Sequence, residues 1–288
     1  MKPVYQIMDS FFGEFEEYLE IPKGKGVRGQ LVLTINPEAE KLAAIVESIH
    51  LASLLHDDVI DNAELRRGVT SVNAKYGPHT AIMLGDIVYS RAFMELVEFP
   101  KPVAYEIAKA VYLLSQGELE DVKLSRQFTP DRNRYFQMIY KKTASLIEGA
   151  CKGAALLRGW DGERFGLYGK NLGLAFQIVD DLLDIVGEEE VLGKPAMGDF
   201  REGKTTLPYI YLYERIDEGE RTHLLSLYKR ELTPEEREWI RQKMEEYGII
   251  EKVKREAVEL VEEAKRAVAD YGIVELEKIA DKVVNRRR

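Results

Sequence analysis

At 288 residues, the chain is long enough for one large domain or two modest ones, and it can bury a core without disulfide bonds. Its 41 Lys and Arg against 50 Asp and Glu give a formal charge of −9, which argues against a protein held on nucleic acid by its overall charge. The single cysteine, Cys151, excludes an internal disulfide framework and fits a reducing compartment. No apolar run reaches the roughly 18 residues of a membrane-spanning helix, and residues 1–10 lack the pattern of a signal peptide. We therefore expect a globular, cytoplasmic protein.

The apolar residues recur every three or four positions along most of the chain, which predicts amphipathic helices. A short alternating run at 30–35 is the best β-like segment, and a helix start would readily absorb it. We predict an all-α fold, a single domain over residues 1–288 built as a large multi-helix bundle. The helical stripes cover 42–49, 103–124, 135–157, 165–186, 207–216 and most of 234–285.

Helix boundaries are marked by hydroxyl, proline and glycine residues. Thr129-Pro130 and Thr233-Pro234 each place a capping hydroxyl before a proline, and Glu236 completes a capping box with Thr233. Gly248 and Gly272 fall where helices should end.

Two acidic clusters stand in otherwise apolar segments. Each reads Asp-Asp-x-x-Asp, so a helix places its first and last aspartates on one face. Like charges on a partly buried face repel unless a cation joins them, and such oxygen ligands suit Mg²⁺ bridging to substrate phosphates. One cluster alone could equally be a solvated helix end, but two predict a site for several magnesium ions. The clusters comprise Asp57, Asp58 and Asp61, and Asp180, Asp181 and Asp184, each just before a helix end marked by Asn62 or Gly187.

Basic residues accompany both clusters. Arg66 and Arg67 follow the first cluster, and Lys25 and Arg28 lie in a glycine-rich run over 24–29 where backbone can approach an anion. His50 lies seven residues before Asp57 and therefore shares its helix face. Each of these residues alone is ordinary, but together they indicate phosphate binding. The second cluster has Lys142-Thr143 before it and Lys194 and Lys204 after it.

With these motifs the chain resembles the trans-isoprenyl diphosphate synthases, prenyltransferases that extend an allylic diphosphate with isopentenyl diphosphate. The resemblance runs from about residue 25 to about residue 212, and its pattern is nearest to long-chain, octaprenyl-type members. It implies the isoprenoid synthase fold, a helical bundle around a central cleft. Besides the residues above, it rests on Gly85-Asp86, Gln116-Gly117-Glu118, Phe176-Gln177 and Gly198-Asp199.

The resemblance also implies a role for each site residue. Asp57, Asp61 and Asp180 would hold Mg²⁺, with Asp58, Asp181 and Asp184 ligating or supporting. Lys142, Thr143 and Gln177 would act at the carbocation formed on ionisation. Arg66, Lys142, Lys194 and Lys204 would bind the allylic diphosphate, and Lys25, Arg28, His50 and Arg67 would bind isopentenyl diphosphate.

Three features depart from the family pattern or extend it. Gly29 stands where the family commonly has proline. The segment before Lys25 is about one helix shorter than usual, which bears on the contact between subunits. Arg286–Arg288 resemble a basic tail that closes some of these sites, although a solvated chain end is the favoured interpretation.

The expected product depends on the fifth and fourth positions before Asp57. These are Ala52 and Ser53, both small, whereas members making short products tend to have aromatic residues there. We therefore expect a long-chain polyprenyl diphosphate of about C30 to C50, a quinone side-chain precursor. A geranylgeranyl (C20) product is the alternative if another residue stops elongation. The exact length, the tunnel floor and the preferred primer stay open.

Two other functions fit the sequence less well. A class I terpene cyclase needs no second diphosphate site such as Lys25, Arg28, His50 and Arg67, and a non-catalytic partner subunit would be expected to lose an acidic cluster. The expected small-molecule partners are isopentenyl diphosphate and an allylic diphosphate (farnesyl, geranyl or dimethylallyl). We further expect a homodimer, peripheral membrane contact on product release, and no nucleic-acid partner.

Overall fold

The structure is a computed structural model that describes residues 1–19, 24–187 and 196–286. Within these residues every regular element is helical apart from one short hairpin, so the prediction of an all-α chain is confirmed. The chain divides into two compact units, each assembled from two stretches of sequence: Met1–Val111 with Gly149–Gly166, and Tyr112–Glu148 with Leu167–Arg288. We call these unit 1 and unit 2. The single domain over residues 1–288 stays a prediction.

Three long helices contain the boundaries between the units: α6 (Lys101–Leu124), α8 (Ser145–Leu157) and α9 (Gly162–Val186). The helical stripes expected at 103–124 and 165–186 correspond closely to α6 and α9. The stripe at 135–157 is divided among α7 (Arg132–Ile139), the π-helical turn η2 (Tyr140–Ala144) and α8.

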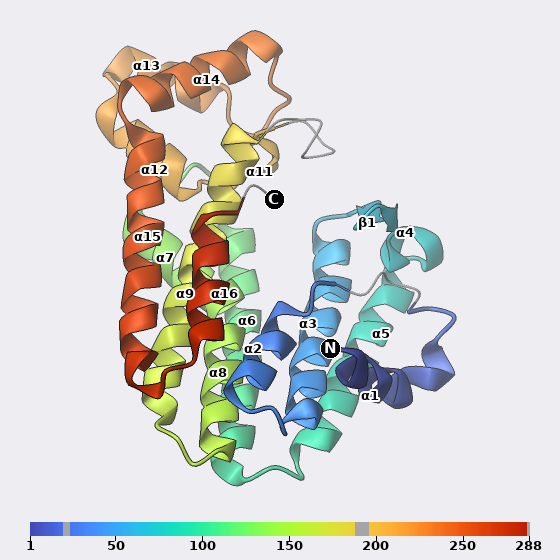
Figure 1. The fold of residues 1–288 in the computed structure, drawn as a ribbon. Coiled ribbons are helices and arrows are strands. Elements are labelled where there is room, and N and C mark those ends of the chain that lie inside the picture. Colours follow the sequence, from blue (N-terminus) through green and yellow to red (C-terminus); the bar gives the residue numbers. More distant parts are fainter. Residues whose placement is uncertain (20–23, 188–195, 287–288) are drawn as a thin grey trace. The chain divides into compact units, whose positions relative to one another are not determined.

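Unit 1 is built around α3 (Glu40–Ile60), which packs against α1 (Lys2–Phe12), α2 (Val27–Ile35) and α5 (Pro78–Leu96) (Figure 1). The apolar stripe at Leu42, Ile45 and Ile49 is fully buried, as its spacing predicts. The run at 30–35 lies inside α2, so it is helical rather than extended. A 3₁₀ turn, η1 (Gly13–Phe15), and the short helix α4 (Val72–Tyr76) complete this unit with the hairpin described next.

A tight hairpin follows α3. Its strands β1 (Leu65–Arg66) and β2 (Val69–Thr70) are antiparallel, with Arg66 opposite Val69. Arg67 and Gly68 form the turn, and both have positive φ (54° and 80°), as a two-residue type I′ turn requires. Of the two adjacent arginines that follow the first acidic cluster, Arg66 therefore ends the first strand and Arg67 begins the turn.

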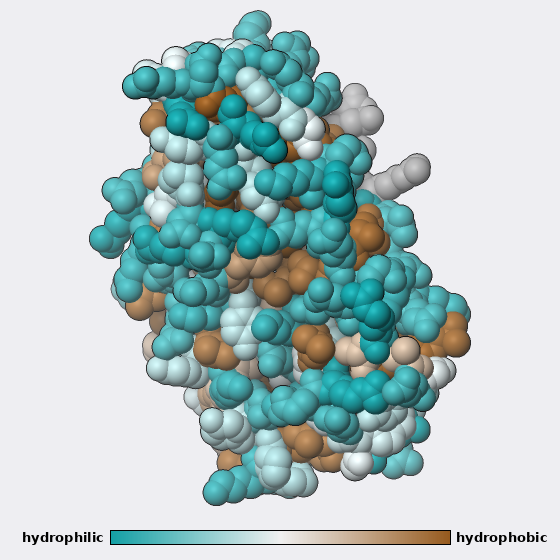
Figure 2. All heavy atoms as spheres, turned by 90° about the vertical axis from the view of Figure 1, so that its left-hand side faces the viewer, coloured by the Kyte–Doolittle hydropathy of each residue, from teal (hydrophilic) through white to brown (hydrophobic). Residues whose placement is uncertain are grey.

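Unit 2 is built around α15 (Ile249–Val268), which packs against α12 (Leu207–Arg215), α14 (Pro234–Glu246) and α16 (Val274–Val284). Val253, Ala257, Val261 and Ala264 form its buried stripe. Figure 2 shows a face where hydrophilic side chains dominate and hydrophobic ones form only small scattered groups, as a chain with 32% charged residues should present. Other described elements are α11 (Gly198–Glu202), α13 (Glu218–Ser226) and η3 (Ala269–Tyr271).

The predicted helix boundaries are confirmed at three positions and wrong at one. Thr233 and Glu236 form the capping box, and Gly248 and Gly272 adopt left-handed φ where helices end. Thr129 does not cap a helix, because its hydroxyl donates to the Gln127 carbonyl (3.1 Å). Asp131 caps α7 instead, since its carboxylate accepts the backbone N–H groups of residues 133 and 134.

Among the described residues, no helix combines the length and apolar character needed to cross a membrane.

Candidate active site

The first acidic cluster lies at the C-terminal end of α3, as predicted, but its members differ. Asp58 is 2% exposed, and its carboxylate accepts from Nε of Arg66 (2.8 Å). The Asp58 carbonyl also accepts the N–H of Ala63 (2.8 Å), so this aspartate anchors the hairpin that follows. Asp57 is half-buried and Asp61 is exposed. The two outer carboxylates are thus presented at the helix end, where the negative end of the helix dipole favours a cation.

Unit 1 places three predicted arginines close enough to His50 for their charges to act on it. Burial, first, and then the charges of Arg28, Arg67 and Arg66 hold the pKa of His50 well below its usual range. The imidazole is therefore neutral at neutral pH and can donate to an anion without adding charge. Burial also lowers the pKa of Arg28, although the carboxylate of Glu47 opposes this. Lys25 is exposed on the adjoining loop.

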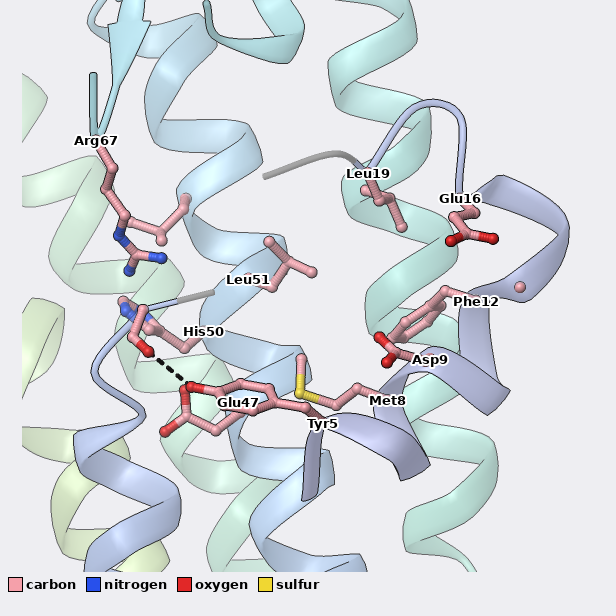
Figure 3. A pocket seen from close by; sticks show the side chains of 13 residues that line it. Tyr5, Met8, Asp9, Phe12, Glu16, Leu19, Glu47, His50, Leu51 and Arg67 are labelled. Carbon is pink, nitrogen blue, oxygen red and sulfur yellow. Dashed lines mark hydrogen bonds between the residues drawn. The ribbon is translucent and has the colours of Figure 1, made fainter. Parts of the chain in front are cut away.

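A cavity of about 210 Å³ opens beside this cluster (Figure 3). Figure 3 shows Arg67 and His50 on one side, and Tyr5, Met8 and Phe12 projecting from α1 on another. Its lining combines cationic, acidic and apolar side chains, so one end suits a phosphate group and the rest suits hydrocarbon. The lining residues are Tyr5, Met8, Asp9, Phe12, Gly13, Glu16, Leu19, Gly24, Glu47, His50, Leu51, Leu54 and Arg67.

Two hydrogen bonds hold the glycine-rich run in place. The Tyr5 hydroxyl donates to the Gly24 carbonyl (2.7 Å), the contact dashed in Figure 3. The Gly29 N–H donates to Oε1 of Glu47 (2.7 Å). Gly24 packs against Arg67 so closely that a Cβ there would lie 2.5 Å from the guanidinium. Sequence reasoning missed Tyr5 and Glu47; the signal for Glu47 is a carboxylate inside an apolar helical stripe.

The structure shows what a side chain at position 85 of the Gly85-Asp86 motif would meet. A Cβ on Gly85 would lie 2.2 Å from Nε2 of His56, and the same nitrogen is 3.4 Å from a carboxylate oxygen of Asp86. A side chain at position 85 would therefore displace the ring of His56, the residue that immediately precedes Asp57.

Ala52 and Ser53, the predicted chain-length residues, lie in unit 1 and are buried. Ala52 is packed in an apolar cluster with Phe12, Leu84 and Val88. The Ser53 hydroxyl donates to the His50 carbonyl (2.9 Å). Neither residue lines the cavity of Figure 3.

In unit 2 a second cavity, of about 150 Å³, brings together most of the other predicted residues. Its lining includes Lys142, Thr143, Gln177, Asp180, Asp181 and Lys204. It also includes Asp121, Tyr135 and Asp199, which were not predicted as site residues. Lys194, a predicted ligand of the allylic diphosphate, lies outside the described residues.

The second acidic cluster ends α9, and two of its three aspartates, Asp181 and Asp184, are buried. Asp181 is buried between Tyr135 and Gln177, and Asp184 accepts the N–H groups of Gly198 (3.2 Å) and Asp199 (3.0 Å). Asp180 is exposed and pairs with Arg286 (3.2 Å), whose guanidinium also lies over the Phe176 ring. Arg286 is therefore held against the second cluster, contrary to the solvated end that was expected.

Two lysines of this cavity are held by carboxylates. Nζ of Lys142 lies 2.6 Å from Asp121 and 3.0 Å from Glu118. Lys204 contacts Glu202 (2.9 Å) and Asp199 (3.5 Å). Burial alone would lower the pKa of Lys204, but these two acids raise it well above its usual range, so its charge is retained. Lys142 and Thr143 lie on η2, and π-helical turns are frequent at functional sites.

The donor set fits magnesium. The cavity of unit 2 offers carboxylates from Asp121, Asp180, Asp181 and Asp199, all hard oxygen donors. Within the described residues no three acidic, histidine or cysteine side chains are arranged as a ready-made metal site. Mg²⁺ is usually held by one or two carboxylates and completed by water and substrate phosphate.

Comparison with known proteins defines the class. The family model described as polyprenyl synthetase matches residues 10–246. The chain is 36% identical over 226 residues to a short chain isoprenyl diphosphate synthase of Methanothermobacter thermautotrophicus, covering 73% of this chain and 70% of that one. It is 36% identical over 224 residues to the octaprenyl diphosphate synthase of Escherichia coli, covering 71% and 69%. The octaprenyl pyrophosphate synthase of Helicobacter pylori superposes with a TM-score of 0.94 at 39% identity, covering 99% and 98%.

The chain therefore belongs to the polyprenyl synthetase family. The predictions of an isoprenoid synthase fold, of this family and of a prenyltransferase of the polyprenyl diphosphate synthase type are confirmed.

Proposed function

We propose that the chain condenses isopentenyl diphosphate onto an allylic diphosphate and that the roles expected of its site residues hold. The observation that carries the proposal is the cavity of unit 2, where carboxylates, lysines, a threonine and a glutamine surround one space. Ionisation of an allylic diphosphate needs this combination: cationic groups for the departing diphosphate and neutral oxygens for the cation left behind.

The reaction balances without a redox partner. The allylic C–O bond breaks, and its electron pair leaves with the diphosphate. The double bond of isopentenyl diphosphate attacks the resulting cation, and one C–C bond forms. A proton then leaves the adjacent carbon to the released diphosphate, which restores a double bond. Water has to be excluded, because it would capture the cation.

Each group of residues has a part in this scheme. Asp57, Asp61 and Asp180 hold Mg²⁺, with Asp58, Asp181 and Asp184 supporting them. Mg²⁺ supplies charge stabilisation for the departing diphosphate. Thr143 and Gln177 face the cation with Lys142. Arg66, Lys142, Lys194 and Lys204 bind the allylic diphosphate, and Lys25, Arg28, His50 and Arg67 bind isopentenyl diphosphate.

The product is a long-chain polyprenyl diphosphate. Relatives named as octaprenyl diphosphate synthases and the small side chains of Ala52 and Ser53 favour this length. A geranylgeranyl product is the second candidate, because one relative is named as a short chain synthase and Ala52 is close-packed.

The protein works as a cytoplasmic homodimer that contacts the membrane when it releases product. Exposed apolar side chains of α5 (Met83 and Met94) and of the residue that follows it, Val97, support the dimer. The single, buried cysteine supports a reducing compartment.

The test is incubation with Mg²⁺, farnesyl diphosphate and labelled isopentenyl diphosphate, with chromatographic sizing of the products. Products of C30 or longer are expected. Absence of elongation from farnesyl, geranyl and dimethylallyl diphosphate would exclude the synthase, whereas a stop at C20 would exclude only the long product. Ala52→Phe is expected to shorten the product, and unchanged length would place the limiting residue elsewhere.

A further inference from the structure

Three hydrogen bonds form a continuous chain across the cavity of unit 2. The Thr143 hydroxyl donates to Oε1 of Gln177 (2.7 Å), and Nε2 of Gln177 donates to Oδ1 of Asp181 (2.7 Å). The Tyr135 hydroxyl donates to the other oxygen of Asp181 (2.5 Å). Tyr135 and Asp181 are buried, at 2% and 4% exposure.

The direction of these three hydrogen bonds is set by Asp181, the acceptor at the end of the series. Both groups that face Asp181 donate to it, Nε2 of Gln177 to Oδ1 and the Tyr135 hydroxyl to the other oxygen. The Gln177 amide must therefore turn its nitrogen toward Asp181 and its oxygen toward Thr143. That oxygen accepts the Thr143 hydrogen, which leaves the hydroxyl lone pairs on the far side.

The orientation of the Gln177 amide sets the sign of the electrostatic field at the reacting carbon. If the amide were reversed, its N–H groups would face the position of the cation and destabilise it, whereas oxygen lone pairs stabilise it. We propose that Asp181 is a positioning residue, held by Tyr135, which orients the Gln177 amide and the Thr143 hydroxyl so that they present oxygen to the allylic cation. This inference rests on the proposed function, and it gives Asp181 and Tyr135 the role of positioning other side chains.

Asp180 and Asp181 are adjacent in the sequence but have different surroundings. Asp180 is exposed and its Oδ1 pairs with Arg286, whereas both oxygens of Asp181 are taken by protein donors. Burial, first, and then Asp181 raise the pKa of Tyr135 well above its usual range, so the phenol keeps the hydrogen that it donates.

The experiment compares Asp181→Asn and Tyr135→Phe with the unaltered chain. Asparagine has nearly the same shape but can donate, so it no longer forces the amide orientation. Asp181→Asn is expected to lower kcat about 100-fold, in the range seen when one preorganised polar group is removed from an active site. Tyr135→Phe removes one hydrogen bond to a carboxylate and is expected to lower kcat about 10-fold.

The readout that distinguishes positioning from metal binding is the Mg²⁺ dependence. Both variants should keep the half-saturating Mg²⁺ concentration and both KM values within about twofold of the unaltered chain. Tyr112→Phe, an exposed tyrosine on α6, is the matched control and should keep full kcat.

Two results would overturn the inference. If high Mg²⁺ restores the kcat of Asp181→Asn, Asp181 is a metal ligand. If Tyr135→Phe keeps the kcat of the unaltered chain, the hydrogen-bond chain has no role in turnover. A failure of the unaltered chain to elongate any primer would instead remove the proposed function itself.

Discussion

The six clustered aspartates share a motif but make different contacts. Asp58, Asp181 and Asp184 are buried and accept hydrogen bonds from protein donors, whereas Asp61 and Asp180 are exposed. A buried carboxylate has to be paired because its desolvation is costly, so the inner members are occupied by structure. Asp61 and Asp180 are reached by solvent, with one oxygen of Asp180 paired with Arg286.

Asp57→Ala should therefore mainly lower activity, whereas Asp58→Ala should mainly lower stability. Asp57→Ala should lower kcat by orders of magnitude and leave the free energy of unfolding within about 1 kcal/mol. Asp58→Ala leaves Arg66 without its carboxylate and should cost about 1–3 kcal/mol of stability. Urea unfolding and steady-state kinetics measure both quantities. A nearly normal kcat for Asp57→Ala would remove that residue from the metal site.

His50 should make stability depend on pH. In the folded chain its pKa is well below the usual value, whereas in the unfolded chain it is about 6.5. The unfolded state then binds the proton more readily, so the free energy of unfolding falls as pH decreases through about 6.5.

The measurement is urea unfolding at pH 7.5 and pH 5.5. His50→Gln should lose less stability between these values than the unaltered chain. His79→Gln, at an exposed position, should lose as much as the unaltered chain, and equal losses in all three would refute the role of His50.

At the scale of elements, α1 both lines the cavity of unit 1 and holds the glycine-rich run through Tyr5. Removing the Tyr5 hydroxyl loses its bond to Gly24, a net loss of about 0.5–1.5 kcal/mol. Tyr5→Phe should therefore raise the KM for isopentenyl diphosphate about 2- to 10-fold and leave kcat and the KM for the allylic substrate unchanged. Tyr105→Phe, an exposed tyrosine, is the control. Equal increases in both KM values would indicate a general loss of structure instead.

The approach of α6 to η2 depends on Gly117. A Cβ there would lie 2.3 Å from the backbone nitrogen of Lys142, and backbone cannot move aside cheaply. Gly117→Ala should cost about 1–3 kcal/mol in urea unfolding and lower kcat by displacing Lys142. Gly153→Ala is the matched control, because its Cβ would meet only atoms at 3.5 Å or beyond. Similar stability of the two variants would contradict the steric argument.

At the scale of the whole molecule, exposed apolar side chains at the end of α5 bear on assembly. Met94 and Val97 are 64% and 81% exposed, which is costly for a chain that stays monomeric. Sedimentation should show a dimer for the unaltered chain and a monomer for the double variant Met94→Lys, Val97→Lys. Val274→Lys, equally apolar and exposed on α16, should stay dimeric. A monomeric unaltered chain would exclude the homodimer.

The sequence by itself determined the helical class and the ends of α3 and α9. These follow from local spacing: helical period places side chains on one face, and Asn62 and Gly187 come just after the helix ends. Thr233 was predicted correctly as a cap because its partner Glu236 lies three residues away.

Only the tertiary structure decided which residues those side chains meet. Thr129 was predicted as a cap, but its hydroxyl bonds Gln127 and its N–H bonds the Thr205 hydroxyl, 76 positions away. Asp181 meets Tyr135 across 46 positions, and Arg286 meets Asp180 across 106. Helical spacing specifies the direction of a side chain, whereas its hydrogen-bond partner depends on which distant segment packs there. For that reason the sequence placed all six aspartates at helix ends, whereas only packing shows that Asp58, Asp181 and Asp184 accept hydrogen bonds from protein groups.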